Sequence, residues 1–256
     1  MTARWGARKV EGGLFDPILE VFLPPFPVFF HLPARDARYR NYYMDIRWQA
    51  ERSIVISAAA GTLVMDPMPG SNPGADMDTS STVATVSHAA ALPGIAGWEE
   101  KVHVIRGPGE YEITGLGVRG IAVPLGDAND PRALNTVYAL DAELITVCHL
   151  GALNGPLTAQ AARLIGHVDV LITPAGGTDQ AISADQAAAV TRTLEPRVVI
   201  PVHPSVPLDG SDFSAFDAFV SEIGLPKPEP VARVTVTRGN LGETQRLVLL
   251  RPQGDS

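Results

Sequence analysis

Cysteine is almost absent from this sequence. The 256 residues include a single cysteine, Cys148, so no intramolecular disulfide can form and a reducing compartment, the cytoplasm, is expected. Clusters of basic residues are lacking as well, since no stretch of the sequence concentrates Lys and Arg. The 28 Asp and Glu outnumber the 20 Lys and Arg, which gives a net charge of −8. A surface that binds nucleic-acid phosphates needs concentrated positive charge, so nucleic acid is not an expected partner.

The sequence also has no uninterrupted apolar run of the ~20 residues that a membrane-spanning helix needs. Apolar residues are frequent at positions 15–33, but Asp16, Glu20 and the prolines at 24, 25 and 27 break the run. Neither a secretory signal peptide nor a spanning helix is therefore expected. We expect residues 1–43 to form an N-terminal extension to a domain at 44–256, and Met44 offers an alternative start.

The extension contains an aromatic and proline-rich segment at 21–30. Its phenylalanines should pack against something, since a cluster of aromatic side chains is unfavourable in water. One interpretation is that the segment folds back on its own domain, or that translation from an upstream start codon adds a segment without a function. The other is a docking arm for a protein partner or for a membrane surface, with the candidate contacts Phe22, Phe26, Phe29 and Phe30.

From Met44 onward, short apolar runs are separated by many of the 24 glycines and 22 prolines, a pattern typical of strands joined by tight turns. The first half is predicted to be rich in β-strands, and the second half to alternate strands with helices. Ser183-Ala184-Asp185-Gln186 is a capping box that opens a helix, and Gly224 is expected to end the last helix. Expected strands are 45–48, 53–57, 62–66, 83–87, 102–105, 118–123, 136–140, 144–148, 168–172, 198–202, 231–236 and 247–250; expected helices are 158–165, 183–194 and 212–223. Strands first and mixed units later favour an α+β sandwich.

Three of the six histidines share a position relative to the predicted strands. His88, His149 and His203 each lie at or just beyond the carboxyl end of a strand, the edge where functional loops gather in such scaffolds. Taken singly, each of them is most simply interpreted as a structural histidine with hydrogen-bonded ring nitrogens. Their shared placement predicts that they converge.

The motifs around these histidines resemble a known family. They are Met65-Asp66-Pro67, Thr85-Val86-Ser87-His88, Gly107-Pro108-Gly109-Glu110-Tyr111-Glu112, Asn135-Thr136-Val137-Tyr138, Cys148-His149-Leu150-Gly151, Pro174-Ala175-Gly176-Gly177 and Ile200-Pro201-Val202-His203. In order and spacing they are similar to the metallo-β-lactamase superfamily, and more narrowly to its ascorbate-6-phosphate lactonase-like branch. The resemblance covers about 44–250 and implies a four-layer αββα sandwich.

The resemblance also implies a metal centre, and this sequence departs from it. Hydrolytic members carry His-x-His-x-Asp-His after the strand that ends here at Ser87, and their two divalent ions activate a bridging water. Here the loop reads His88-Ala89-Ala90-Ala91-Leu92-Pro93, so only its first histidine remains. Ser87 is not expected to act as a nucleophile with His88, because adjacent residues on a strand point to opposite faces.

The other implied ligand positions are also changed. The family's Gly-Asp turn reads Gly151-Ala152, and the middle histidine falls near Pro124 or Leu125, with Asp127 or Asp130 as substitutes if the register is shifted. The final histidine is retained as His203. His149 and Asp66 match residues that support the site, which leaves the vestigial set Asp66, His88, His149 and His203.

These changes lead to three hypotheses for function. The first is a degenerate, non-catalytic binding or scaffold subunit without a cofactor, assembled with itself, with an active paralogue or with another protein. The second is a hydrolase with one zinc, iron or manganese ion held by His88, His203 and either His149 or Asp127. The third is a small-molecule binder that uses the old cleft.

Overall fold

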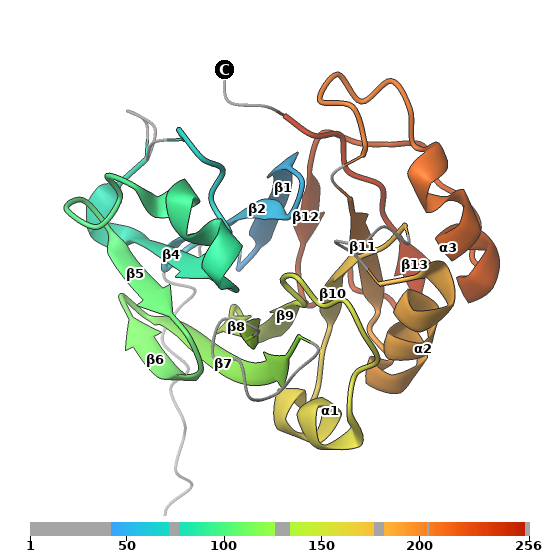
Figure 1. Cartoon of the computed structure of the whole chain (residues 1–256), viewed down its shortest axis with the longest axis horizontal. Coiled ribbons are helices and arrows are strands. Elements are labelled where there is room, and N and C mark those ends of the chain that lie inside the picture. Colours follow the sequence, from blue (N-terminus) through green and yellow to red (C-terminus); the bar gives the residue numbers. More distant parts are fainter. Residues whose placement is uncertain (1–41, 72–76, 126–133, 177–181, 204, 254–256) are drawn as a thin grey trace, which may run out of the picture. The chain divides into compact units, whose positions relative to one another are not determined.

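In a computed structural model, whose described residues are 42–71, 77–125, 134–176, 182–203 and 205–253, two mixed β-sheets carry the fold. One has the strand order β12 (Val234–Val236), β1 (Met44–Ala50), β2 (Ser53–Ala58), β3 (Gly61–Met65), β4 (Thr82–Val86) and β5 (His103–Arg106). The other has the order β13 (Arg246–Leu247), β11 (Val198–Val202), β10 (Val170–Pro174), β9 (Ile145–His149), β8 (Leu134–Ala142), β7 (Leu116–Pro124) and β6 (Gly109–Ile113). Figure 1 shows the strands with α1, α2 and α3 beside the second sheet.

The core between the sheets follows from alternation along the strands. In β1, residues Met44, Ile46 and Trp48 are fully buried while the residues between them are partly exposed. Such a period of two places every second side chain on one face. These side chains pack into one cluster with Val118 and Leu140 of the second sheet, so the two sheets share an apolar interior.

The second half supplies the parallel strands and the helices. Strands β9, β10, β11 and β13 pair in parallel, which requires crossover connections, and these contain α1 (Ala159–Ile165) and α2 (Ala184–Leu194). A short 3₁₀ helix, η3 (Ser214–Phe216), leads into α3 (Asp217–Ile223). The helices bury apolar faces such as Ala187 and Phe219 in the main core. They form the layer outside the second sheet.

The outer face of the first sheet is covered by irregular structure. Val55, Val64 and Ala84 form a second apolar cluster with Ile95 and Trp98, which belong to the segment around η2 (Ala89–Ile95). The Trp98 indole N–H donates to the Ser71 carbonyl at 2.9 Å and so satisfies its buried polar atom. A further 3₁₀ turn, η1 (Thr79–Ser81), precedes β4. The predicted αββα layering is confirmed, with 3₁₀ structure over the first sheet.

The predicted strands and helices are confirmed in order, and the largest differences concern β6, the last helix and the last two strands. Strand β6 was not predicted, because glycine, proline and glutamate interrupt the apolar pattern there; its Tyr111 and Ile113 pack on the core while Glu110 stays exposed. The last helix begins later than predicted because the Asp212 carboxylate accepts the Ser214 N–H at 2.7 Å. The last two strands are shorter than predicted. Val231 and Leu250, which lie in the two predicted strands, pair only in an isolated parallel bridge.

The predicted capping box at Ser183 and the predicted helix end at Gly224 agree with the structure. The Ser183 N–H donates to Gln186 Oε1 at 3.2 Å, as a capping box requires. Gly224 has a φ of 69° and its N–H donates to the Val220 carbonyl, which ends α3. No helix among the described residues is long and apolar enough to cross a membrane. The candidate contacts Phe22, Phe26, Phe29 and Phe30 lie outside the described residues.

Tyr138 of β8 joins the two sheets through its hydroxyl. It is fully buried, its O–H donates to the Val86 carbonyl at 3.0 Å, and it accepts the Gly107 N–H at 2.9 Å. Both partners belong to the first sheet or to the turn that follows β5. Burial raises the pKa of Tyr138, so the phenol stays protonated and keeps its donor.

Tyr138→Phe should lower the free energy of unfolding by about 1–3 kcal/mol, because the Gly107 N–H and the Val86 carbonyl lose a buried partner. Urea denaturation of the two proteins measures the change. Tyr111→Phe is the matched control, since its half-buried hydroxyl makes only 3.3 Å contacts, and a change within ~0.5 kcal/mol is expected. Equal losses in the two variants would contradict a bridging role for Tyr138.

Candidate functional site

The four residues predicted to form the vestigial site lie at strand ends. Asp66 follows β3, His88 follows β4, His149 ends β9 and His203 follows β11. Burial lowers the pKa of His88 and of His149, and the charge of Asp66 opposes that shift in both. Their positions at strand ends are as the sequence predicted.

A hydrogen-bonded chain links Asp66, Ser87 and His88. The buried carboxylate of Asp66 accepts the Ser87 N–H at 2.7 Å and the Ser87 O–H at 2.5 Å. Ser87 Oγ also lies 3.0 Å from Nδ1 of His88. An ionised carboxylate can only accept, so the hydroxyl proton points to Asp66 and His88 must donate from Nδ1. The lone pair of His88 is therefore on Nε2.

This chain corrects the expectation that Ser87 and His88 point to opposite faces. Both residues come after Val86, the last residue of β4, so the alternation of the strand no longer applies to them. The argument against Ser87 as a nucleophile therefore rests on its hydrogen bonds and not on strand alternation. Its hydroxyl donates to Asp66 and not to His88, so His88 is not placed to remove its proton.

His149 is fully buried and is tied to the first sheet. Its Nε2 lies 2.9 Å from the carbonyl oxygen of Arg52, in the turn between β1 and β2. A carbonyl only accepts, so Nε2 carries the proton and Nδ1 holds the lone pair. Nδ1 has no hydrogen-bond partner among the described residues. Burial is the main cause of a lowered pKa for His149, which keeps the ring neutral.

In His203 the ring proton lies on Nε2, whereas a histidine that binds a metal through Nε2 has its proton on Nδ1. The Ser205 N–H donates to Nδ1 of His203 at 3.0 Å, which places the ring proton on Nε2. The ring packs edge-on against Phe216 with centroids 6.5 Å apart, and a side chain at Gly176 would collide with it. Within the described residues Nε2 has no partner. His203 therefore presents a donor to its surroundings.

The turn Gly151-Ala152, where the resemblance implies a bridging carboxylate, is held by the side chain of Asn135. Asn135 accepts the Ala152 N–H at 2.9 Å and donates to the Leu150 carbonyl at 2.9 Å. Gly151 has a φ of 60°, and a Cβ there would meet Ser87 and Asn135. The turn is thus packed directly against the Asp66–Ser87–His88 chain, but its side chain is the buried methyl of Ala152.

These residues do not fit a metal ion of the kind that the resemblance implies. Zinc sites need three or four ligands with their lone pairs free and directed at one point. Of the three histidines, only His88 at Nε2 and His149 at Nδ1 present a lone pair, since His203 presents a proton. Among the described residues, no three His, Cys, Asp or Glu side chains form a group that could hold a metal. Asp127 and Asp130 lie outside that part of the chain.

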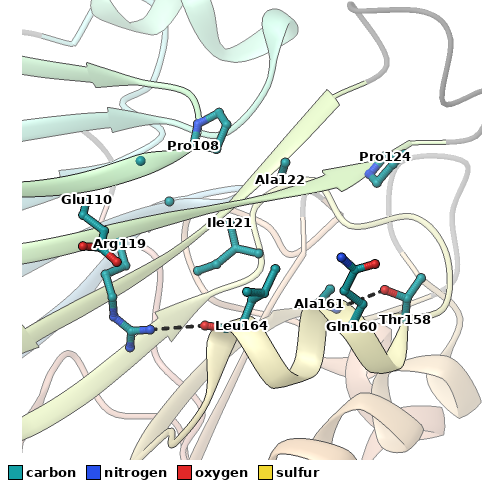
Figure 2. A pocket seen from close by; sticks show the side chains of 12 residues that line it. Pro108, Glu110, Arg119, Ile121, Ala122, Pro124, Thr158, Gln160, Ala161 and Leu164 are labelled. Carbon is teal, nitrogen blue, oxygen red and sulfur yellow. Dashed lines mark hydrogen bonds between the residues drawn. The ribbon is translucent and has the colours of Figure 1, made fainter.

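Two hollows lie near the predicted positions. A cleft of about 170 Å³ beside His88 is lined by Ser87, Ala89, Leu92 and Thr136. A larger hollow of about 630 Å³ lies on the outer side of β7 against α1, and Pro124 lines it. Figure 2 shows two hydrogen bonds among its lining residues: Arg119 donates to the Leu164 carbonyl at 3.3 Å, and Thr158 accepts the Ala161 N–H at 3.1 Å. None of the three histidines lines the larger hollow.

Arg52 was not identified from the sequence. Its carbonyl oxygen accepts the Nε2 proton of His149, and its own Nε is buried without a hydrogen-bond partner among the described residues. The sequence signal was weak, because an arginine in a tight turn between two strands is usually exposed. Only the tertiary fold brings this turn to His149.

Two sheets face to face, with polar side chains gathered at strand ends, define the sandwich class of the metallo-β-lactamases. A family model described as "Beta-lactamase superfamily domain" matches residues 45–203, more than half of the chain. The chain belongs to this family. A search of curated proteins found no match.

Solved structures agree on the fold. A putative Zn-dependent hydrolase of the metallo-β-lactamase superfamily from Thermotoga maritima superimposes with a TM-score of 0.58 and 24% identity, over 81% of this chain and 98% of that one. Igni18, a metallo hydrolase from Ignicoccus hospitalis, gives 0.53 and 17% over 76% and 98%. CmlA, a diiron β-hydroxylase from Streptomyces venezuelae, gives 0.55 and 12% over 76% of this chain and 54% of CmlA. At these identities the likeness concerns the fold alone.

The lowered pKa of His149 predicts that acid destabilises the protein. The folded pKa lies below the ordinary value of 6.5, so the stabilisation is complete above pH 6.5 and is lost as the pH falls towards the folded pKa. Each such histidine contributes a slope of up to about 1.4 kcal/mol per pH unit in that window. Urea denaturation at about pH 7.5 and about pH 5.5 should show a smaller difference for His149→Gln than for the wild type.

His103→Gln is the control for this measurement, because His103 is exposed on β5. It should keep the wild-type difference between the two pH values. A wild-type difference that His149→Gln leaves unchanged would contradict the assignment of His149 as a buried neutral imidazole.

Proposed function

We propose that this chain is a non-catalytic member of the β-lactamase superfamily that acts as a binding or scaffold subunit. The observation that carries the proposal is the hydrogen bond from the Ser205 N–H to Nδ1 of His203, which commits the retained final histidine to donating from Nε2. Ala152 at the position of the bridging carboxylate supports it, as does Leu92 in the cleft beside His88, at the position of the Asp in the His-x-His-x-Asp-His motif.

Metal content tests the proposal. Elemental analysis of full-length protein, purified without chelator or a metal-binding tag, should find below about one-tenth of an equivalent of zinc, iron or manganese per chain. The double variant His88→Ala/His203→Ala should give the same value. About one equivalent in the wild type, lost in the variant, would contradict a metal-free site.

The orientation of His88 favours a second candidate, a hydrolase with one metal ion. Metal-binding histidines usually donate their other ring N–H to an acceptor that is itself held by a carboxylate or backbone, and Ser87 and Asp66 play these parts here. His88 would bind the ion through Nε2. For this candidate, His88→Ala should remove both the metal and the turnover, whereas active protein without metal would exclude it.

The scaffold role needs a partner, and the candidate contacts are the phenylalanines of the N-terminal segment. In the full chain, replacement of Phe22, Phe26, Phe29 and Phe30 by serine should reduce the molar mass measured by light scattering, or the recovery of a co-purifying paralogue. The expected loss reflects the ~1.5–3 kcal/mol that each buried apolar side chain contributes. Replacement of the exposed Leu144 and Leu164 by serine is the control. Unchanged assembly in the phenylalanine variant would exclude the segment as the docking arm.

A further inference from the structure

Strands β5 and β6 are the last strands of the two sheets on one side of the molecule. No other described strand pairs with the outer side of β5 in the six-stranded sheet or of β6 in the seven-stranded sheet. Residues of both strands line one hollow of about 550 Å³, the edge hollow (Figure 1). Its apolar lining includes Val104 and Ile105 of β5 and Tyr111 and Ile113 of β6.

Strand β6 has the features of a strand that accepts another strand. It pairs with β7 in an unbroken antiparallel register from Gly109 to Ile113, without a bulge. In such a ladder every second residue directs its N–H and C=O away from the neighbouring strand. Natural edge strands are commonly blocked by proline, lysine or a bulge, and Gly109–Ile113 contains none of these. As far as the described chain extends, the backbone of β6 is therefore open to an eighth strand.

One face of β6 carries negative charge. Glu110 lines the hollow on the α1 side of β7, and alternation along the strand places Glu112 on the same face. Both side chains are exposed, and neither takes part in an ion pair of the described residues. Arg119 of β7 is opposite Glu110 in the register, but its guanidinium is bound to Asp141 and to two carbonyl groups of α1. The two glutamates therefore remain available to a positively charged neighbour.

The other face of β6 is apolar. Tyr111 and Ile113 pack against the core and line the edge hollow, and both remain partly exposed. A strand added beside β6 alternates its own side chains between the same two faces. Positive charge is favourable on the face of Glu110 and Glu112, and apolar side chains are favourable on the face of the edge hollow. The edge thus favours a strand in which basic and apolar residues alternate.

A second copy of this chain does not match the edge. Antiparallel pairing of two β6 strands about Tyr111 places Glu110 opposite Glu112 twice, and like charges directly opposite each other are unfavourable. Strand β5 of another copy carries its exposed basic residues, His103 and Arg106, on opposite faces because they are three residues apart. Neither strand supplies the required alternation, so the expected occupant is a different protein.

We propose that β6 accepts, as the eighth strand of its sheet, an extended segment of a partner protein in which Lys or Arg alternates with apolar residues. The backbone of β6 supplies hydrogen bonds, Glu110 and Glu112 supply charge complementarity, and the edge hollow receives the apolar side chains. This inference goes beyond the proposed function, because it names an interaction surface and a partner chemistry that do not depend on the metal content of the histidine site.

A fluorescently labelled Lys-Val-Lys-Val-Lys-Val-Lys peptide tests the proposal by anisotropy titration of the full-length protein. It should bind at least about tenfold more tightly than Lys-Lys-Lys-Lys-Val-Val-Val, which has the same charge and composition without the alternation. Equal binding of the two peptides would overturn the proposal.

Charge reversal on β6 tests the role of the glutamates. Glu110→Lys/Glu112→Lys should weaken binding of the alternating peptide by at least about fivefold, because two attractions across the strands become repulsions. Glu222→Lys/Glu243→Lys is the matched control, since both residues are exposed elsewhere and the net charge changes equally. It should change the affinity by less than about twofold, because distant charges are screened by salt. Equal losses in the two variants would contradict a site on β6.

Methylation of the peptide amides tests the backbone pairing on the wild-type protein. One peptide is methylated at its Lys amides and another at its Val amides. Alternate amides of an added strand point towards β6 and away from it, so one set should abolish binding and the other should keep at least about half of the affinity. Similar losses for both sets would overturn the proposal.

Two further results are distinguishable from these. A wild-type dimer in light scattering that the alternating peptide dissociates would assign the edge to a second copy and overturn the proposal. An equivalent of zinc in the wild type would contradict the proposed function alone, since peptide binding at β6 is measured independently of the histidines.

Discussion

The arrangement at the strand ends depends on how the buried carboxylate of Asp66 is satisfied. Two hydrogen bonds from Ser87 fix its direction, and through Ser87 it fixes the ring of His88. Gly151 approaches Ser87 so closely that no side chain fits there, which brings the end of β9 into the same unit. Parts of both sheets are therefore arranged around one negative charge.

Stability of the sandwich itself comes from elsewhere. The apolar cluster between the sheets runs from Met44 and Trp48 to Leu249, and the Tyr138 hydroxyl connects the sheets at their polar edge. Neither feature requires an ion, because apolar burial is non-directional and the tyrosine bonds are to backbone. This explains how a chain with Ala152 at the position where the resemblance implies a bridging carboxylate can keep the family's fold.

The order of the strands and helices and the sandwich fold could be predicted from the sequence, because strand periodicity and the motif order are local signals. The positions of His88, His149 and His203 at strand ends followed directly from them. The contact between the Arg52 carbonyl and His149 could not be predicted, since it depends on a turn meeting β9 across the two sheets. The Ser87–His88 contact was missed because strand alternation stops at Val86. Protonation of each ring nitrogen also required partners that only the fold supplies, such as the N–H of Ser205.

The central claim is that the histidines are organised by hydrogen bonds for a site without metal. Long-range ¹H–¹⁵N correlation spectra of full-length protein, recorded in chelator and again with added zinc, report which ring nitrogen carries the proton. The account predicts the proton on Nε2 of His203 and His149 and on Nδ1 of His88, unchanged by zinc. A proton on Nδ1 of His203, or a zinc-dependent shift of its Nε2, would contradict it.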